Sequence, residues 1–184
     1  MPEPDVNSRD PPRMLVVFAG LPGTGKTTVA REVARRRGAF YLRIDTIEQS
    51  MRQGGLSNDE IGPTGYAVGM ALARDNLAAG QIVVADAVNP VPQARAAWRD
   101  IAAGQSVPLL EIELICTDTL EHQRRVQART SDIIGLVPPT WDEVVQRHYV
   151  PWDVDHWVID TAVSSPSEIA TAICTRLDAL ATQR

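Results

Sequence analysis

The segment from Gly20 to Thr27 constrains the fold of this chain more than any other feature. It reads GLPGTGKT and satisfies the pattern G-x-x-x-x-G-K-[ST] at every position. A continuous apolar run at residues 14–19 precedes it and predicts a strand covered on both faces, as in a parallel sheet. Residues 26–37 follow with apolar side chains at helical spacing, and Gly38 is typical of a helix end. A strand, a glycine-rich turn and a helix in this order are the context in which the pattern binds phosphate.

This turn has the chemistry of a phosphate cradle. Its glycines let successive backbone N–H groups point at phosphate oxygens, and the N-terminus of the following helix adds positive potential. Lys26 is predicted to reach the β- and γ-phosphates, and the Thr27 hydroxyl is predicted to hold Mg²⁺. The predicted nucleotide-binding residues are Gly20, Pro22, Gly23, Thr24, Gly25, Lys26, Thr27 and Thr28. The segment therefore predicts a nucleoside triphosphate site, with ATP and Mg²⁺ as cofactors.

The rest of the chain alternates between strand patterns and helix patterns. Further strands are expected at residues 39–44, 81–85, 109–116 and 156–159. Helices are expected at residues 46–53, 63–79, 91–103, 118–129, 140–149 and 167–180. This alternation predicts an α/β protein with a parallel sheet. We expect one domain over residues 14–184, preceded by a polar, proline-rich and flexible tail at residues 1–13.

Lys26 is the only lysine among the 18 lysine and arginine residues of the 184-residue chain. A GTPase ordinarily carries an N-K-x-D motif for guanine, which a chain with its single lysine in the phosphate loop cannot contain. Motor ATPases generally need more chain and carry an acidic pair after the third strand, where this chain has only Asp86. The small P-loop kinases remain. Arginine does not replace a compact ammonium between two phosphates. The one lysine of the chain therefore lies at the position where phosphate binding requires lysine.

The order of these motifs resembles the P-loop kinases of the AAA-33 type. The resemblance rests on the loop at 20–28, an acidic residue after the second strand, the sequence DAVN at 86–89 and an arginine-rich helix before a loop. That group is similar to gluconate kinase, chloramphenicol phosphotransferase, zeta toxins and the polynucleotide kinase domain. The resemblance implies a three-layer P-loop NTPase fold with a five-stranded parallel sheet and a helical lid at about 118–150. It also implies transfer of the γ-phosphoryl group of ATP to a hydroxyl of a small molecule.

Two carboxylates are predicted at the carboxyl ends of strands, where parallel sheets bind their ligands. Asp45 follows the second strand, and Asp86 follows the third. A carboxylate can orient an acceptor hydroxyl and take its proton, and the resemblance implies this role for Asp45, with a helix cap as the alternative. Asp86 is a predicted ligand of Mg²⁺ or of the acceptor, with a turn-forming role as the alternative. Asn89 is a further predicted acceptor-binding residue, although its place before Pro90 also favours turn chemistry.

Glu48 bears on the charge of the acceptor. Many relatives carry an arginine at this position, three residues after the acidic residue of the second strand, where it serves anionic acceptors. A carboxylate there would repel a phosphorylated or carboxylated acceptor, unless Glu48 is only a solvated helix residue. We therefore expect a neutral or amine-bearing acceptor. A nucleotide, nucleoside or RNA-end kinase is one alternative, and a nucleotide-binding regulator or toxin-like ATPase is another.

Arginines mark the expected lid. Arg125 and Arg129 lie four residues apart on one predicted helix, hence on one face. The resemblance implies that they close over the transferring phosphoryl group and neutralise its charge, with Arg147 as a weaker candidate. In similar kinases the adenine base lies near the end of the fifth strand, which here corresponds to residues 161–165. The three histidines, including His122, lack the spacing of a metal site or a nucleophile pair.

Charge and hydropathy argue against several other partners. The net charge of −5 argues against a nucleic-acid-binding surface, which needs a basic face. No apolar run approaches the ~20 residues of a membrane span, and the start of the chain does not resemble a signal peptide. We therefore expect a cytoplasmic protein with a small-molecule acceptor and no membrane partner. The sequence leaves the oligomeric state open.

Overall fold

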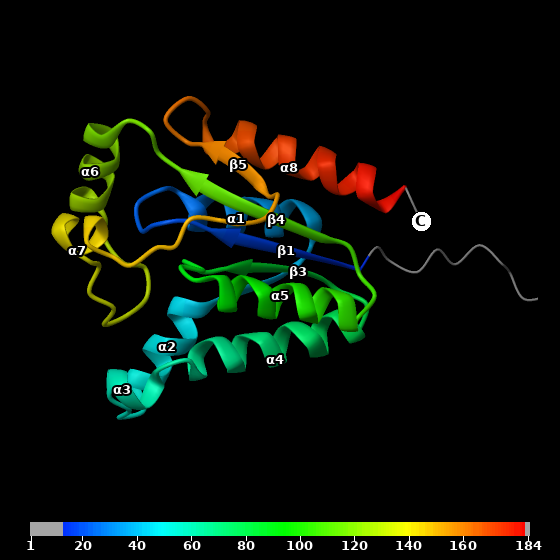
Figure 1. The fold of residues 1–184 in the computed structure, drawn as a ribbon, viewed down its shortest axis with the longest axis horizontal. Coiled ribbons are helices and arrows are strands. Elements are labelled where there is room, and N and C mark those ends of the chain that lie inside the picture. The colour runs from blue at the N-terminus through cyan, green and yellow to red at the C-terminus, as the bar shows by residue number, and fades with distance from the viewer. Residues whose placement is uncertain (1–12, 183–184) are drawn as a thin grey trace, which may run out of the picture.

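The computed structural model describes residues 13–182, and its centre is a five-stranded sheet in which the strands pair in parallel (Figure 1). The strands are β1 (Met14–Ala19), β2 (Phe40–Arg43), β3 (Ile82–Asp86), β4 (Leu109–Ile115) and β5 (Trp157–Asp160). Their order across the sheet is β2-β3-β1-β4-β5. The predicted α/β fold with a five-stranded parallel sheet is confirmed. Of the predicted flexible tail, residues 1–12 lie outside the described residues.

Helices connect the strands and cover both faces of the sheet, so the fold has the three predicted layers (Figure 1). They are α1 (Lys26–Arg37), α2 (Ile44–Gln53), α3 (Asn58–Ile61), α4 (Thr64–Ala78), α5 (Pro92–Gly104), α6 (Thr119–Ala128), α7 (Trp141–Val145) and α8 (Pro166–Ala181). Over residues 13–182, none of the helices combines the length and the apolar character that crossing a bilayer would require.

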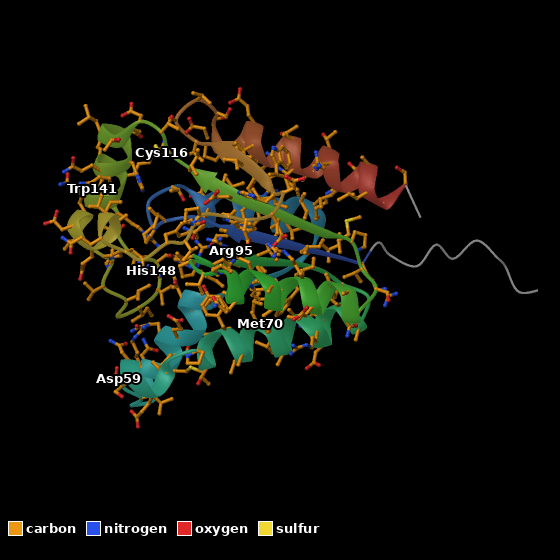
Figure 2. The ribbon with its side chains drawn as sticks, viewed as in Figure 1. Asp59, Met70, Arg95, Cys116, Trp141 and His148 are labelled. Atoms are coloured by element: carbon orange, nitrogen blue, oxygen red, sulfur yellow. The ribbon has the colours of Figure 1, made fainter. Side chains whose placement is uncertain are left out.

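Alternate residues of β1 face two separate hydrophobic cores. Val16 and Phe18 pack with α1 and α8 on one face of the sheet. Leu15 and Val17 pack with α4 and α5 on the other face, in the core that also contains Met70 of α4 (Figure 2). All four β1 side chains are fully buried. This accounts for the continuous apolar run in the sequence, because a central strand of a parallel sheet has no polar face.

The strand order brings the phosphate loop and the predicted acidic residues to one edge of the sheet. β1 lies between β3 and β4, and β2 pairs with β3. The loop after β1, Asp86 at the end of β3 and the start of α2 after β2 therefore meet at the carboxyl edge. Beyond this edge lies the predicted lid, residues 118–150, which contains α6, α7 and the loop between them (Figure 1).

Two of the predicted helix boundaries differ from the structure by more than one residue. α2 begins at Ile44, two residues before the predicted start at 46, so Asp45 lies in its first turn and is neither the end of the strand nor the helix cap. The positive end of the helix stabilises an acidic side chain there. α7 ends at Val145, four residues before the predicted end at 149, although Thr140 and Glu143 form the expected capping box.

Candidate active site

The phosphate loop turns tightly between β1 and α1. Gly25 precedes α1 with a φ of 91°, and Lys26 is the first helical residue. Nζ of Lys26 donates a hydrogen bond to the Leu21 carbonyl (2.8 Å), and the Thr24 hydroxyl donates to the same carbonyl (2.9 Å). Both side chains are therefore held inside the curve of the loop. The helix that follows has no acidic residue in its first turn, so its N-terminus attracts anions.

Two glycines of the loop are required by close approach as well as by backbone conformation. Gly20 has a φ of +128°, and a Cβ there would overlap the Leu114 carbonyl oxygen. Gly23 has a φ of +85°, and a Cβ there would overlap a methyl group of Val126 in α6. An L side chain is strained at both angles and has no room at either position. The first helix of the lid thus packs directly on the phosphate loop.

The surroundings of Lys26 control its charge, because the residue is only 7% exposed. Burial lowers the pKa of its ammonium group from 10.5 to about 8, while the carboxylates of Asp86 and Asp45 oppose that shift. The positive charges of Arg129 and Arg147 in the lid lower the pKa as well. Phosphate oxygens in the loop would favour the charged form. Lys26 is thus a buried amine whose protonation depends on the anions beside it.

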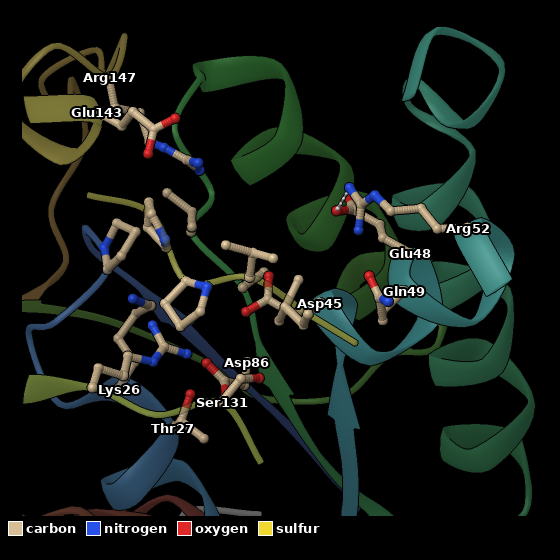
Figure 3. Close-up of a pocket in the computed structure, with 18 of the residues that line it drawn as sticks. Lys26, Thr27, Asp45, Glu48, Gln49, Arg52, Asp86, Ser131, Glu143 and Arg147 are labelled. Atoms are coloured by element: carbon tan, nitrogen blue, oxygen red, sulfur yellow. Dashed lines mark ion pairs between the residues drawn. The ribbon is translucent and has the colours of Figure 1, made fainter. Parts of the chain in front are cut away.

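A cleft of about 530 Å³ opens beside the loop, a size that suits a metabolite. It lies between the phosphate loop, α2, the end of β3 and the lid (Figure 3). The predicted site residues that line it are Pro22, Lys26, Thr27, Asp45, Glu48, Asp86, Arg129 and Arg147. Two further charged residues, Arg52 and Glu143, complete the charged part of the lining. The structure therefore brings three of the four predicted acceptor residues into one cavity with side chains of the phosphate loop.

Thr27 and Asp86, the predicted magnesium ligands, both line the cleft. Asp86 is 3% exposed, and the Tyr41 hydroxyl donates a 2.7 Å hydrogen bond to its Oδ2. Within residues 13–182, no three His, Cys, Asp or Glu side chains are grouped to hold a metal ion by themselves. Mg²⁺ prefers oxygen ligands and is usually held by one or two carboxylates, waters and substrate phosphates. The hydroxyl and the carboxylate therefore fit Mg²⁺ bound together with a nucleotide.

Glu48 faces the cleft from α2, with 22% of its side chain exposed (Figure 3). Its Oε2 lies 3.5 Å from Nη2 of Arg52, one turn further along the helix. Burial raises the pKa of Glu48, the charge of Asp45 raises it as well, and Arg52 opposes both. Glu48 is therefore a half-buried carboxylate of the cleft. The Arg52 charge beside it weakens the repulsion that Glu48 exerts on an anionic acceptor.

Asn89 does not reach the cleft, and its predicted contact with the acceptor is wrong. The side chain is fully buried: Nδ2 donates to the Phe18 carbonyl (2.8 Å), and Oδ1 accepts from the Trp98 indole (3.0 Å). The Asn89 backbone has a φ of 50°, and its carbonyl accepts a hydrogen bond from Nε of Arg95 (2.9 Å) on α5 (Figure 2). Asn89 therefore shapes the turn after β3. This turn role is the alternative that the position of Asn89 before Pro90 favours.

The structure separates the two predicted lid arginines. Arg129, which caps the end of α6, lines both the cleft and a second cavity of about 420 Å³ beside Gly25 and Thr28. Arg125 also lines the second cavity, but its guanidinium donates to the hydroxyl (2.9 Å) and the carbonyl (3.1 Å) of Thr161, just after β5. Arg125 is therefore fixed beside the predicted adenine residues, and Arg129 lies between the phosphate loop and the cleft.

Besides Arg52 and Glu143, two residues at the site were not predicted from the sequence. His122 in α6 is buried, and its Nε2 lies 2.8 Å from the Pro22 carbonyl of the phosphate loop, which makes this nitrogen the donor. Arg43 at the end of β2 is buried beside Asp45 and Asp86 and lines the second cavity. The contact of His122 joins residues 100 positions apart, so no local pattern reveals it.

Several known proteins are similar to this chain in sequence or in fold. The AAA domain family AAA_33 matches residues 15–147. The guanylate kinase of Thermobifida fusca (strain YX) is 32% identical over 149 residues, which cover 80% of this chain and 72% of that protein. The APS kinase of Mycobacterium tuberculosis, solved with AMPPNP and APS, has a TM-score of 0.67 at 20% identity, over 91% of this chain and 99% of its own. The gluconokinase of Sinorhizobium meliloti 1021 has a TM-score of 0.61 at 20% identity, over 95% of this chain and 96% of its own.

The family match includes the phosphate loop, the acidic residues of the cleft and both lid helices. The solved kinases share the architecture of the whole domain. Together, these relationships support a nucleotide-dependent kinase in general terms and leave the acceptor open. The chain belongs to the AAA_33 family and has the P-loop kinase fold.

Proposed function

We propose that this protein is a kinase that transfers the γ-phosphoryl group of ATP to a hydroxyl of a small, neutral or amine-bearing molecule. One observation carries the proposal: a metabolite-sized cleft lined by four carboxylates opens onto the phosphate loop. Phosphoryl transfer needs little covalent chemistry from the protein, because positioning and charge stabilisation supply most of the catalysis. In this proposal the loop positions the nucleotide, and the cleft positions the acceptor.

Asp45 is the proposed general base. It lines the cleft with 41% of its side chain exposed, so a carboxylate oxygen can accept the proton of an acceptor hydroxyl. An alcohol is a weak nucleophile until this proton is shared, whereas a phosphate acceptor is already anionic and needs no base. A carboxylate at this place therefore favours a hydroxyl acceptor.

The phosphate side of the proposed reaction relies on positive charge. Lys26 and the loop amides hold the β- and γ-phosphates, and Arg129 neutralises charge on the transferring group. Thr27 and Asp86 hold Mg²⁺, which when bound supplies positive charge to the β- and γ-phosphate oxygens. The lid covers the site and keeps water from the phosphoryl group.

The adenine base is proposed to lie beside Thr161. A cavity of about 220 Å³ there is also lined by Gly25, Thr28, Arg125 and Ser164. A planar guanidinium stacks well on a flat aromatic ring, and Thr161 holds the guanidinium of Arg125 in place. In this proposal Arg125 serves the base, and Arg129 alone of the two predicted arginines serves the transition state.

A nucleotide is the second candidate acceptor, and one observation favours it. Arg52, Arg129 and Arg147 line the cleft beside the carboxylates, and guanidinium groups bind phosphate in a bidentate manner. The relative from Thermobifida fusca is named a guanylate kinase. However, Arg52 is already paired with Glu48, and a phosphate in the cleft would meet the carboxylates of Asp45 and Glu48. We therefore place the neutral acceptor first.

A screen of pooled compounds tests the proposal. The full-length protein is incubated with ATP, Mg²⁺ and either hydroxylated metabolites or nucleoside monophosphates, and mass spectrometry detects products heavier by one phosphoryl group. Asp45→Ala is the blank, and Asp59→Ala, which changes an exposed acidic residue of α3, is the matched control.

Three outcomes are distinct. A neutral alcohol that is phosphorylated by the wild type and by Asp59→Ala, but not by Asp45→Ala, supports the proposal. Products from nucleoside monophosphates alone would establish the second candidate. ATP hydrolysis without a product in either pool would contradict kinase activity and favour a nucleotide-dependent regulator.

A further inference from the structure

One carboxylate fastens the lid loop to the body of the protein. Asp132, in the loop between α6 and α7, accepts a 2.9 Å hydrogen bond from Nη1 of Arg43 and also pairs with Arg31 of α1. Nearby, Gln53 of α2 donates a 2.7 Å hydrogen bond to the backbone carbonyl of Ile134 in the same loop. The loop is therefore tied both to the sheet and to the helix that carries the proposed base.

Arg43 is the buried partner in this contact. Only 2% of its side chain is exposed, against 48% for Asp132. Its Nε lies 3.9 Å from Oδ2 of Asp86, and its Nη2 lies 3.8 Å from Oδ2 of Asp45, distances too long for hydrogen bonds. Across residues 13–182, no group provides a hydrogen-bond acceptor to either of these two nitrogens. A buried guanidinium with unsatisfied donors is costly in free energy. The hydrogen bond to Asp132 therefore determines the position of the Arg43 guanidinium.

We propose that Arg43 is a positioning residue that switches between the lid loop and the two carboxylates of the site. With the loop closed, Asp132 draws the guanidinium away from Asp45 and Asp86. With the loop open, Arg43 loses its hydrogen-bonded carboxylate, and Asp45 and Asp86 are the acidic groups within 4 Å that replace it. The displacement required is small, because both oxygens already lie just beyond hydrogen-bond distance.

The catalytic consequence rests on the proposed function. In the open state Arg43 pairs with the proposed base, Asp45, and with the proposed Mg²⁺ ligand, Asp86, so neither is available for the reaction. In the closed state both carboxylates are released when the cleft is covered. Bound ATP is thereby protected from hydrolysis while water has access to the site, because the groups that promote transfer are masked.

A crystal structure of ligand-free Asp132→Ala tests the switch directly. Asp142→Ala is the matched control, because Asp142 is an exposed acidic residue of the same lid in α7. In Asp132→Ala we expect Nε or Nη2 of Arg43 within about 3 Å of Asp45 or Asp86, and in Asp142→Ala we expect the present distances. An Arg43 that keeps its position in Asp132→Ala would overturn the proposal. The comparison needs no nucleotide, so it decides the question even if the proposed function fails.

Magnesium binding provides a second readout. Mg²⁺ is titrated by calorimetry into the wild type, Asp132→Ala and the double variant Asp132→Ala/Arg43→Gln, each with saturating AMPPNP. We expect Asp132→Ala to weaken the Mg²⁺ affinity about tenfold, the effect of one charge-assisted hydrogen bond to Asp86. Removing the guanidinium in the double variant should restore the affinity to within about threefold of the wild type.

The double variant separates a switch from a structural role. If Arg43 only supports the fold, removing it lowers the Mg²⁺ affinity further, and a double variant as weak as Asp132→Ala would contradict the proposal. A wild type that binds no Mg²⁺ with AMPPNP would instead count against the proposed function, and the crystal structures of Asp132→Ala and Asp142→Ala would still decide whether Arg43 moves.

Discussion

The phosphate loop and the cleft beside it adjoin each other, yet they are built in different ways. The loop is one short stretch of chain whose backbone is proposed to do most of the binding, with Gly20 and Gly23 held where no side chain fits. The cleft collects side chains from α2, β3 and the lid, including residues as far apart as Asp45 and Arg147. The loop depends on local conformation, and the cleft depends on the tertiary structure.

In the proposed function, this difference separates nucleotide binding from acceptor choice. A backbone cradle is specified by glycines and by a helix N-terminus, and it recognises the phosphates that all nucleoside triphosphates share. A cleft made of side chains on separate elements can change its acceptor through few substitutions. We therefore expect changes in the loop to act on nucleotide binding and changes in the cleft to act on transfer.

Lys26→Met should cause the largest loss on the loop side. We expect kcat/KM for ATP to fall about thousandfold, because the substitution removes a buried ammonium that is proposed to hold the phosphates. Lys26→Arg is the matched control: it keeps the charge but not the compact shape, and we expect a loss nearly as large. Initial rates over a range of ATP concentrations give both values. Wild-type kinetics in Lys26→Met would exclude the loop from the reaction.

Gly23→Ala should break the packing between the lid and the loop. We expect a loss of about 2–4 kcal/mol in the free energy of unfolding, from a strained φ and from overlap with Val126. Gly38→Ala is the control for strain alone, because it has a φ of +58° and nothing within 4 Å of the added Cβ. Adding Val126→Ala to Gly23→Ala should recover part of the loss in chemical denaturation. Equal losses for the two glycine variants would show that the overlap is unimportant.

The same difference explains which parts of the molecule could be predicted from the sequence. The phosphate loop was predictable because its strand, turn and helix are contiguous, and the parallel sheet followed from the alternation of elements. Asp45 and Asp86 were expected at one site because strand ends of a parallel sheet share an edge, and both line the cleft. The exact start of α2 was missed, because an aspartate suits a helix cap as well as a first turn.

Contacts between distant segments could not be predicted in this way. Arg43 meets Asp132 across 89 positions, and His122 meets the phosphate loop across 100. Asn89 was assigned to the acceptor because a polar residue after a strand looks the same in the sequence whether it faces a cleft or the core. The two bonds of its amide, to a carbonyl of β1 and to an indole of α5, become visible only in the structure.

Nucleotide binding should take up protons in the alkaline range. Burial lowers the pKa of Lys26 to about 8 in the ligand-free protein, below its value of 10.5 in an exposed chain. Folding therefore releases a proton between these values, and the stability of the ligand-free protein rises with pH across that window. Phosphates restore the charged form.

Calorimetry in two buffers of different ionisation enthalpy measures this uptake. We expect a fraction of one proton to be taken up with AMPPNP at about pH 8.5 and none at about pH 6.5, where Lys26 is already charged. The same small uptake at both pH values would show that Lys26 is not the group that meets the phosphates.

Glu48→Gln should have the smallest effect, confined to the cleft. Removing this charge should raise kcat/KM for an anionic analogue of the acceptor about fivefold, since a half-buried charge a few ångströms away contributes about 1 kcal/mol. The value of kcat/KM for the neutral acceptor should stay nearly unchanged. Arg52→Gln removes the positive charge of the same ion pair and should lower kcat/KM for the anionic analogue. Competition assays with the two acceptors measure the ratio, and an unchanged ratio in both variants would exclude Glu48 from acceptor choice.

The kcat of Asp45→Asn tests the central claim most directly. It is measured at saturating ATP with the acceptor that the screen identifies. The substitution keeps the shape of the side chain and removes its ability to take a proton. We predict a kcat about thousandfold below that of the wild type, with AMPPNP affinity unchanged within about twofold. Transfer at the wild-type rate in Asp45→Asn would contradict the claim that this cleft activates a hydroxyl acceptor through Asp45.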